Sequence, residues 1–328
     1  MTILVTGSAG HLGEALVRTL RRQHRAVVGL DVNPSPFTDR VGSITDRDFV
    51  RESMAGVQAV VHAATLHKPH VATHSPQAFI DTNVTGTLVL LEEAARAGVG
   101  SFVYTSTTSV FGAALTPEPG APAAWITEGV VPRPKNIYGV TKHAAEQLCE
   151  LFASKHRLPV VVLRTGRFFP EADDDAAIRG RYSIANAMAN ELLYRRADVE
   201  DIVDAHLLAL EHGAAIGFGR YVVSATSPFT PADLAALGRD APSVVHRLFP
   251  ECAALYAAQG WTLFPSIDRV YVNHLAATVL GWHPKYDFHH VLKSLRLGQD
   301  YRSALAIAVG SKGYHATVFE EGPYPVAP

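Results

Sequence analysis

The stretch TILVTGSAGHLGEALVRTLRRQ (2–23) decides the fold of this chain. It opens with a short apolar run typical of a buried strand and closes with apolar side chains at helical spacing. Between the two stand Gly7, Gly10 and Gly13. Gly7 permits a tight turn, Gly10 lets the backbone approach a pyrophosphate, and Gly13 allows the helix to pack closely on the strand. The stretch therefore predicts a strand, a phosphate-binding turn and a helix whose N-terminus favours negative charge.

The same alternation continues to about residue 165. Short β-branched runs predict further strands, and the segments between them predict helices. Near-continuous apolar strands that alternate with helices indicate a parallel sheet covered on both faces. The predicted fold class is therefore α/β, with a Rossmann-type doubly wound parallel sheet over residues 1–165. The predicted strands cover 26–31, 59–62, 101–106 and 159–165, and the predicted helices cover 46–54, 76–97 and 138–156.

The rhythm of the sequence changes after residue 165. A smaller C-terminal substrate-binding lobe is expected over residues 166–328, interleaved with elements that return to the main sheet. Within it, residues 200–213 predict a helix with Gly213 as its C-cap, and residues 220–225 predict a strand. The tail, 310–328, has no clear period, and three interpretations stay open: a clamp, an interface arm or a disordered end.

Composition narrows the classes of function. The 328 residues carry 29 Lys and Arg against 31 Asp and Glu, and this balance indicates neither a nucleic-acid partner nor an anionic membrane. No window offers about 18 uncharged apolar residues, so no membrane span is expected. The chain opens on a strand rather than a signal peptide, and two cysteines make no disulfide framework, so we expect a cytoplasmic location. The acidic run EADDD (171–175) is interpreted as a solvated loop.

Asp31 ends the second predicted strand, about twenty residues after the glycine turn. A carboxylate at this place can bind the ribose hydroxyls of a dinucleotide, and it repels a 2′-phosphate. The neighbouring residues GLDVNPSPF (29–37) include no basic side chain that would attract such a phosphate. The sequence therefore favours NAD over NADP as the cofactor.

Tyr138 and Lys142 stand four residues apart at the start of a predicted helix, in NIYGVTKHAAEQL (136–148). That spacing places both on one face of the helix. A lysine ammonium beside a tyrosine hydroxyl favours the phenolate, which can take a proton from an alcohol or return one to a ketone. The hydroxyl-rich run FVYTSTTSVFG (102–112) ends another strand at the edge where such sheets bind ligands, and it offers a hydroxyl for the substrate oxygen.

Together these motifs resemble the extended short-chain dehydrogenases/reductases, within the NAD-dependent epimerase/dehydratase family. The resemblance runs from residue 3 to about residue 297. It implies NAD as cofactor and hydride exchange with a secondary alcohol. The motifs that carry it are TGSAGHLG (6–13), Asp31, VVHAAT (60–65), NVTGT (83–87), VYTSTTSVFG (103–112), YGVTK (138–142), LRTGRFFP (163–170) and LGWHPKYDF (280–288).

The resemblance also assigns roles to single residues. Tyr138 would be the acid/base, Lys142 would tune it and hold the nicotinamide ribose, and Thr107, three residues before Val110, would hold the substrate oxygen. Its neighbours Ser106 and Thr108 are weaker alternatives to Thr107. The residues implied in cofactor binding are Gly7, Ala9, Gly10, His11, Leu12, Gly13, Asp31, Ser43, Ile44, His62, Ala63, Ala64, Asn83, Thr105, Tyr138 and Lys142.

Two positions depart from the family pattern. Dehydratases of the family carry Asp-Glu after the catalytic threonine, where this chain has Thr108 and Ser109. The chain is therefore not expected to be a dehydratase, and Thr108 becomes a possible substrate contact. Arg167 stands where nucleotide-sugar epimerases usually have asparagine, and an arginine there would suit a substrate carboxylate or phosphate.

The shared chemistry leaves the fate of the ketone open. If the ketone stays bound and is reduced again, the enzyme is an epimerase; if it leaves, the enzyme is a dehydrogenase, or a ketoreductase in reverse. The resemblance favours a sugar or sugar-like substrate, with a non-sugar ketone and a non-catalytic NAD sensor as alternatives. It also implies a homodimer, formed through the helices near 76–97 and 138–156.

Four histidines crowd the run VVHAATLHKPHVATH (60–74): His62, His67, His70 and His74. His70 and His74 have a spacing that metal ligands on a helix can use, but Pro69 argues against a regular helix there. In the family this run ends a strand and passes over the nicotinamide into the substrate pocket. We therefore expect no metal site. The resemblance places His67 best to touch the substrate or the nicotinamide, and two interpretations stay open for His70 and His74: substrate donors or residues at the rim of the pocket.

Overall fold

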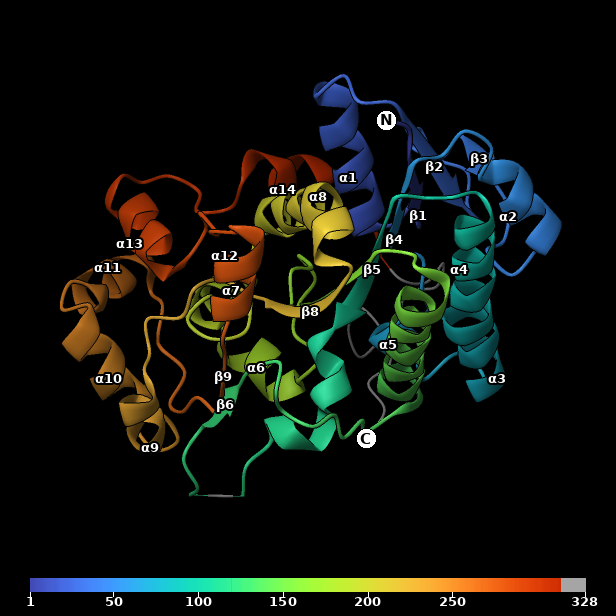
Figure 1. The fold of residues 1–328 in the computed structure, drawn as a ribbon. Coiled ribbons are helices and arrows are strands. Elements are labelled where there is room, and N and C mark those ends of the chain that lie inside the picture. Colours follow the sequence, from blue (N-terminus) through green and yellow to red (C-terminus); the bar gives the residue numbers. More distant parts are fainter. Residues whose placement is uncertain (119, 314–328) are drawn as a thin grey trace.

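A seven-stranded parallel sheet forms the centre of the molecule (Figure 1). The computed structural model describes residues 1–118 and 120–313. The strand order is β3-β2-β1-β4-β5-β7-β8, so β1 and β4 lie on either side of the point where the order reverses. A crevice opens there at the carboxyl ends of the strands. The strands are β1 (Ile3–Thr6), β2 (Val27–Asp31), β3 (Arg40–Val41), β4 (Ala59–His62), β5 (Ser101–Thr107), β7 (Val160–Thr165) and β8 (Phe218–Val223).

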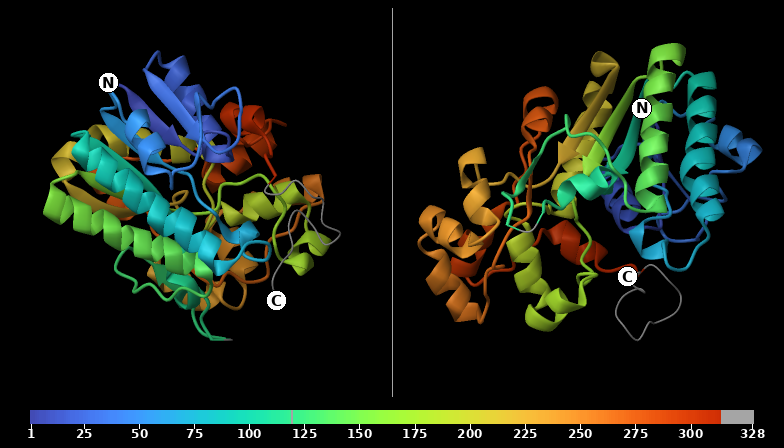
Figure 2. Two further views of the ribbon diagram at one scale, coloured as in Figure 1. Left: turned by 90° about the vertical axis from the view of Figure 1, so that its right-hand side faces the viewer. Right: turned by 90° about the horizontal axis from the view of Figure 1, so that it is seen from below.

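Helices cover both faces of this sheet, as the sequence predicts. Two long helices lie side by side on one face (Figure 2), and apolar residues of β4, β5 and β7 pack under them. The elements of this face are α2 (Arg47–Ser53), α3 (Pro76–Phe79), the π-helical turn η2 (Ile80–Thr85), α4 (Gly86–Arg96) and α5 (Ile137–His156). The other face carries α1 (His11–Arg22), α8 (Val199–Ile216), α12 (His274–Leu280) and α14 (Ala304–Val309).

The predicted end of α8 is wrong. The helix continues past Gly213 to Ile216, and Gly217, with φ +70°, is its C-cap. Gly213 has a packing role instead, because a Cβ atom there would lie 2.4 Å from Oγ of Ser101 on β5. The glycine therefore lets the helix approach the sheet.

A second lobe has its own apolar cluster, which α7, α10, α11 and α13 build. A two-stranded parallel sheet, β6 with β9, joins residues 124–126 to residues 269–271, so a segment from the predicted first domain pairs with this lobe. The elements are η1 (Lys68–His70), η3 (Thr108–Leu115), β6 (Ala124–Ile126), α6 (Ala176–Arg181), α7 (Ile184–Glu191), η4 (Pro231–Asp233), α9 (Leu234–Leu237), α10 (Ala241–Leu248), α11 (Cys252–Gln259), β9 (Arg269–Tyr271) and α13 (Phe288–Arg296).

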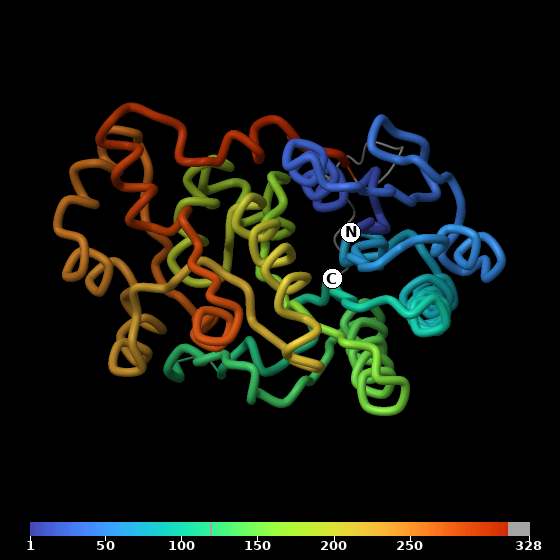
Figure 3. The backbone as a smooth tube through the Cα atoms, turned by 45° about the horizontal axis from the view of Figure 1, so that its top comes forward, coloured from blue at the N-terminus to red at the C-terminus, as the bar shows by residue number. Residues whose placement is uncertain are grey.

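After α13 the chain runs back to α1 (Figure 3). Residues 314–328, most of the tail for which a clamp, an interface arm and disorder were weighed, lie outside the described residues. Within the described part of the chain, every helix is too short or too polar to span a bilayer.

Candidate active site

A cavity of about 920 Å³ opens at the carboxyl ends of the strands, between the sheet and the second lobe. It is bordered by all the predicted cofactor and substrate residues except His62 and Asn83. Those that border it include the glycine turn, Asp31, Ser43, Ile44, Ala63, Ala64, Thr105, Thr107, Thr108, Tyr138, Lys142, His67, His70 and Arg167. The sequence motifs therefore converge on one cavity.

The glycine turn has the shape that a diphosphate requires. Gly7 has φ +75°, and a Cβ atom at Gly13 would lie 1.9 Å from the carbonyl oxygen of Gly7. Gly10 caps the N-terminus of α1 without a side-chain hydrogen bond. The first N–H groups of α1 therefore face the cavity without a side-chain cap, as an anion-binding helix end does.

Asp31 stands beside the glycine turn with its carboxylate fixed in place. One oxygen accepts from the backbone N–H of Ala9 at 3.1 Å, and the other accepts from Asn33 at 2.9 Å. Both bonds leave acceptor lone pairs for ribose hydroxyls. These residues fit the adenosine end of NAD.

Tyr138, Lys142 and Thr107 meet at the far end of the cavity. Asn136 caps α5 by accepting from the N–H of Gly139 at 3.0 Å, which fixes Tyr138 in the first turn. Thr107 ends β5, and its hydroxyl hydrogen-bonds the tyrosine. Lys142 donates to the backbone carbonyl of Thr105 at 2.7 Å. Thr105 lies on β5, two residues before Thr107.

Burial controls the charge of both α5 side chains. It raises the pKa of Tyr138 to about 12, although the hydrogen bond from Thr107 opposes the change. It lowers the pKa of Lys142 to about 7, against the opposing effects of Cys149 and Glu146. A positive charge placed beside this pair would favour the tyrosine phenolate.

His62 and Asn83 lie behind the cavity wall, which corrects the predicted place of His62 beside the cofactor and leaves Asn83 as a support of the backbone of the site. The ring of His62 is 1% exposed and bridges Thr6 and Thr87 at 2.8 and 2.9 Å. Asn83 holds the cavity wall from behind, because its side chain accepts from Leu66 N–H and donates to the Leu66 carbonyl. Both residues support the loop 63–66 rather than border the cavity.

The histidine loop follows this wall. The ring of His67 lies 6.5 Å from that of Tyr138 and 4.9 Å from that of His70, measured between ring centroids. His70 accepts from the backbone N–H of His67 at 3.0 Å, and its ring lies 5.0 Å from that of His74. Across residues 1–118 and 120–313, no three His, Cys, Asp or Glu side chains are grouped so as to hold a metal.

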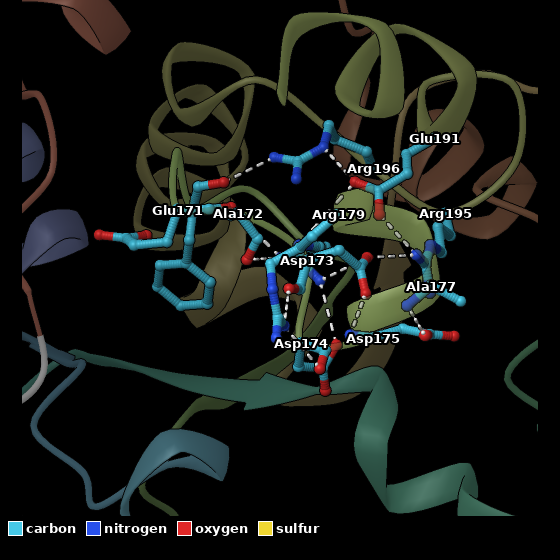
Figure 4. Close-up of polar contacts among 12 residues, drawn as sticks. Glu171, Ala172, Asp173, Asp174, Asp175, Ala177, Arg179, Glu191, Arg195 and Arg196 are labelled. Atoms are coloured by element: carbon cyan, nitrogen blue, oxygen red, sulfur yellow. Dashed lines mark hydrogen bonds and ion pairs between the residues drawn. The ribbon is translucent and has the colours of Figure 1, made fainter. Parts of the chain in front are cut away.

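The acidic run 171–175 is not a solvated loop, as the sequence suggested. Asp173 is 7% exposed and pairs with Arg167 at 3.1 Å. It also pairs with Arg195 at 2.9 Å (Figure 4). Glu191 joins the same cluster through Arg195 and Arg196. Asp173 can be buried because Arg167 and Arg195 neutralise its carboxylate, whereas Asp175 at the end of the run is exposed.

Several residues that border the cavity carry no signal in the local sequence. Lys68 forms an ion pair with Asp174 from the loop after β7. The others come from distant segments, so only the fold brings them together: Glu171, Arg195, Arg269, Tyr271, Lys312 and Gly313.

The model of the NAD dependent epimerase/dehydratase family matches residues 3–224. The chain is 27% identical over 282 residues to UDP-glucose 4-epimerase of Erwinia amylovora, a match that covers 71% of this chain and 81% of that one. It is 33% identical over 168 residues to the uncharacterised protein y4nG of Sinorhizobium fredii, which covers 50% of this chain and 40% of y4nG. It is 36% identical over 184 residues to dTDP-glucose 4,6-dehydratase of Streptomyces niveus, or 50% of this chain and 53% of the dehydratase. The chain thus spans about half the length of two of these relatives.

Among solved structures, the fold is similar to a short-chain dehydrogenase/reductase superfamily protein of Agrobacterium tumefaciens with bound NAD. The TM-score is 0.65 at 26% identity, and the match covers 91% of this chain and 98% of that one. UDP-N-acetylglucosamine 4-epimerase of Bacillus cereus shares the fold, with a TM-score of 0.63 at 19% identity over 90% of this chain and 98% of the epimerase.

Proposed function

Since the chain belongs to the NAD-dependent epimerase/dehydratase family and its cofactor is NAD, we propose that it oxidises a secondary alcohol of a sugar or sugar-like substrate. Tyr138 takes the hydroxyl proton, Thr107 hydrogen-bonds the same oxygen, and Lys142 tunes the tyrosine. The bound dinucleotide supplies the hydride acceptor. The chain supplies position and electrostatics.

One observation carries this proposal: Tyr138, Lys142 and Thr107 come from separate elements, α5 and β5, and meet in the cavity that also holds the glycine turn and Asp31. The glycine turn and Asp31 would bind the two ends of the adenosine diphosphate. The retained tyrosine and lysine argue against a purely NAD-sensing role.

The arginines at the cavity do not by themselves select an anionic sugar. Three of them border it, Arg167, Arg195 and Arg269, and each is already paired with a carboxylate: the first two with Asp173, and Arg269 with Asp268. Relatives include L-arabinose 1-dehydrogenase and NAD-dependent glucose-6-phosphate dehydrogenase of Haloferax volcanii. A sugar, a sugar phosphate and a nucleotide sugar are therefore the substrates to test.

Dehydration is not part of the proposal. Elimination of water by this family uses an acid pair after the catalytic threonine, and Thr108 and Ser109 offer hydroxyls there instead. A dehydratase is among the relatives, so a product lacking one water would refute this point.

We further propose a cytoplasmic homodimer. Val140 and Leu151 on α5 are 50% and 46% exposed, and Ile80 on the adjoining π turn is 40% exposed. Such apolar side chains suit a two-fold contact of paired helices. A monomer by light scattering would contradict it. Both cysteines are free and buried, as a reducing compartment allows.

The test incubates the chain with NAD and L-arabinose, glucose 6-phosphate or UDP-glucose, and follows NADH absorbance and product NMR. Net NADH identifies a dehydrogenase, and a stereoisomer without net NADH identifies an epimerase. Tyr138→Phe should lose turnover by at least about 10²-fold and still bind NAD. Full activity in that variant would overturn the mechanism.

A further inference from the structure

The last described residues return to the phosphate-binding turn. Helix α14 packs against α1 and α8, and Gly310, with φ +59°, ends it. Ser311 then donates to the carboxylate of Glu171 at 2.8 Å, and Nζ of Lys312 lies 2.5 Å from the carboxylate of Glu14. Lys312 therefore borders the cofactor cavity from a segment about 300 residues away from the glycine turn along the chain.

His11, the first residue of α1, is a buried histidine whose ring makes no hydrogen bond to the described residues. It is 7% exposed and lies beside the contacting rings of Phe168 and Phe169, at centroid distances of 5.9 and 6.0 Å. Neither ring nitrogen has a hydrogen-bond partner among the described residues. Buried polar groups in native proteins are almost always paired, and His11 borders the cofactor cavity, so a ligand bound there can supply the partner.

His11 is uncharged near neutral pH and can act as a hydrogen-bond donor. Burial lowers the pKa of His11 to about 4, against the carboxylates of Glu171 and Glu14 and together with the cations Lys312 and Arg196. The imidazole is therefore neutral near pH 7 and carries one N–H. That N–H can donate to a phosphate oxygen.

The buried carboxylate of Glu14, near the N-terminus of α1, requires a cation to balance its charge. Its side chain is 4% exposed, one turn into α1, where a bare carboxylate would repel a diphosphate. Arg18 pairs with it at 2.7 Å and Lys312 at 2.5 Å. The Lys312 side chain is 30% exposed and borders the cavity, and an ammonium has three donors, so it can serve Glu14 and a phosphate together.

We propose that the side chains of His11 and Lys312 bind the pyrophosphate of NAD, in addition to the backbone N–H groups of the glycine turn. The segment 310–313 is then a part of the cofactor site. It reaches that site because the chain returns from the second lobe to the main sheet through α14. This inference rests on the proposed placement of NAD along the glycine turn and is independent of catalysis by Tyr138.

The experiment titrates the full chain by calorimetry with NAD, ADP and adenosine. His11→Phe keeps an aromatic ring and removes the N–H, and Lys312→Met keeps the length and removes the charge. Each variant should bind NAD and ADP about tenfold more weakly, and should bind adenosine, which lacks phosphate, as the unmodified chain does. Lys293→Met, at an exposed lysine of α13, is the matched control and should change nothing.

A double variant separates direct binding from charge balance. If Lys312 contacts the diphosphate, Glu14→Gln with Lys312→Met should bind NAD more weakly than Glu14→Gln alone. Equal affinity of these two variants would overturn the role of Lys312. Unchanged NAD affinity in His11→Phe, or an equal loss for adenosine, would overturn the role of His11. These experiments measure binding and not turnover. Their results therefore do not depend on whether Tyr138 is the catalytic residue.

Discussion

Nε2 of His206, on α8, lies 2.9 Å from the hydroxyl of Thr105, on β5. The other ring nitrogen lies 2.7 Å from the carbonyl of Ile202, so Nδ1 carries the proton and Nε2 accepts from the threonine. The carbonyl of that same threonine accepts from Lys142. A neutral core histidine thus orients Thr105, whose carbonyl holds Lys142.

This arrangement predicts a loss of stability in acid. Burial lowers the pKa of His206 to about 4, so the unfolded chain takes up a proton below about pH 6.5 while the folded chain does not. The free energy of unfolding should therefore fall by roughly 3 kcal/mol from this residue as the pH drops from about 6.5 to about 4. Urea unfolding at pH 7.5, 6.5, 5.5 and 4.5 measures it. His206→Gln should show a shallower fall, and an identical slope in both chains would refute the assignment.

Glu146 is the buried counterpart of Arg164, and breaking this pair should destabilise the fold. The guanidinium donates to Glu146 at 2.7 and 3.1 Å, and Ser106 donates at 2.6 Å. Glu146→Gln leaves a buried arginine uncompensated, so we expect about 3–5 kcal/mol less stability in urea unfolding. Glu150→Gln, one turn along the same helix and on the surface, should cost under about 1 kcal/mol. A comparable loss in both variants would argue against a special role for the buried pair.

Asp31 should decide between the two dinucleotides. Its carboxylate would accept from ribose hydroxyls and repel a 2′-phosphate. Asp31→Ser should weaken NADH binding by about tenfold and tighten NADPH binding, as measured by cofactor fluorescence titration. The control is Asp46→Ser, at the N-cap of α2, which should leave the ratio of the two affinities unchanged. A ratio that stays the same in Asp31→Ser would contradict the assigned role.

The sequence was informative wherever a function depends on neighbours along the chain. The glycine turn and the Tyr138–Lys142 spacing each involve a few consecutive residues, and periodicity placed them on a strand end and a helix start. It failed for His62, because a histidine at a strand end gives no sign of whether its ring turns to the cavity or to the core. It also missed Lys312 and Arg195, since only the packing of distant segments brings those charges to the cavity.

Gly13 tests the packing that holds the turn together. A Cβ atom there would lie 1.9 Å from the carbonyl oxygen of Gly7 and 2.7 Å from Cα of Ser8, and both neighbours are backbone that cannot rotate away. Gly13→Ala must therefore push α1 off the turn, with an expected loss of about 1–3 kcal/mol in the free energy of unfolding and a weaker affinity for NAD. Gly180→Ala is the matched control, because a Cβ atom there meets nothing within 4 Å and alanine favours the helix α6. Urea unfolding and NADH titration of both variants measure the effect. If the two variants had the same free energy of unfolding and the same affinity for NADH, Gly13 would not be required for the close contact between α1 and the turn.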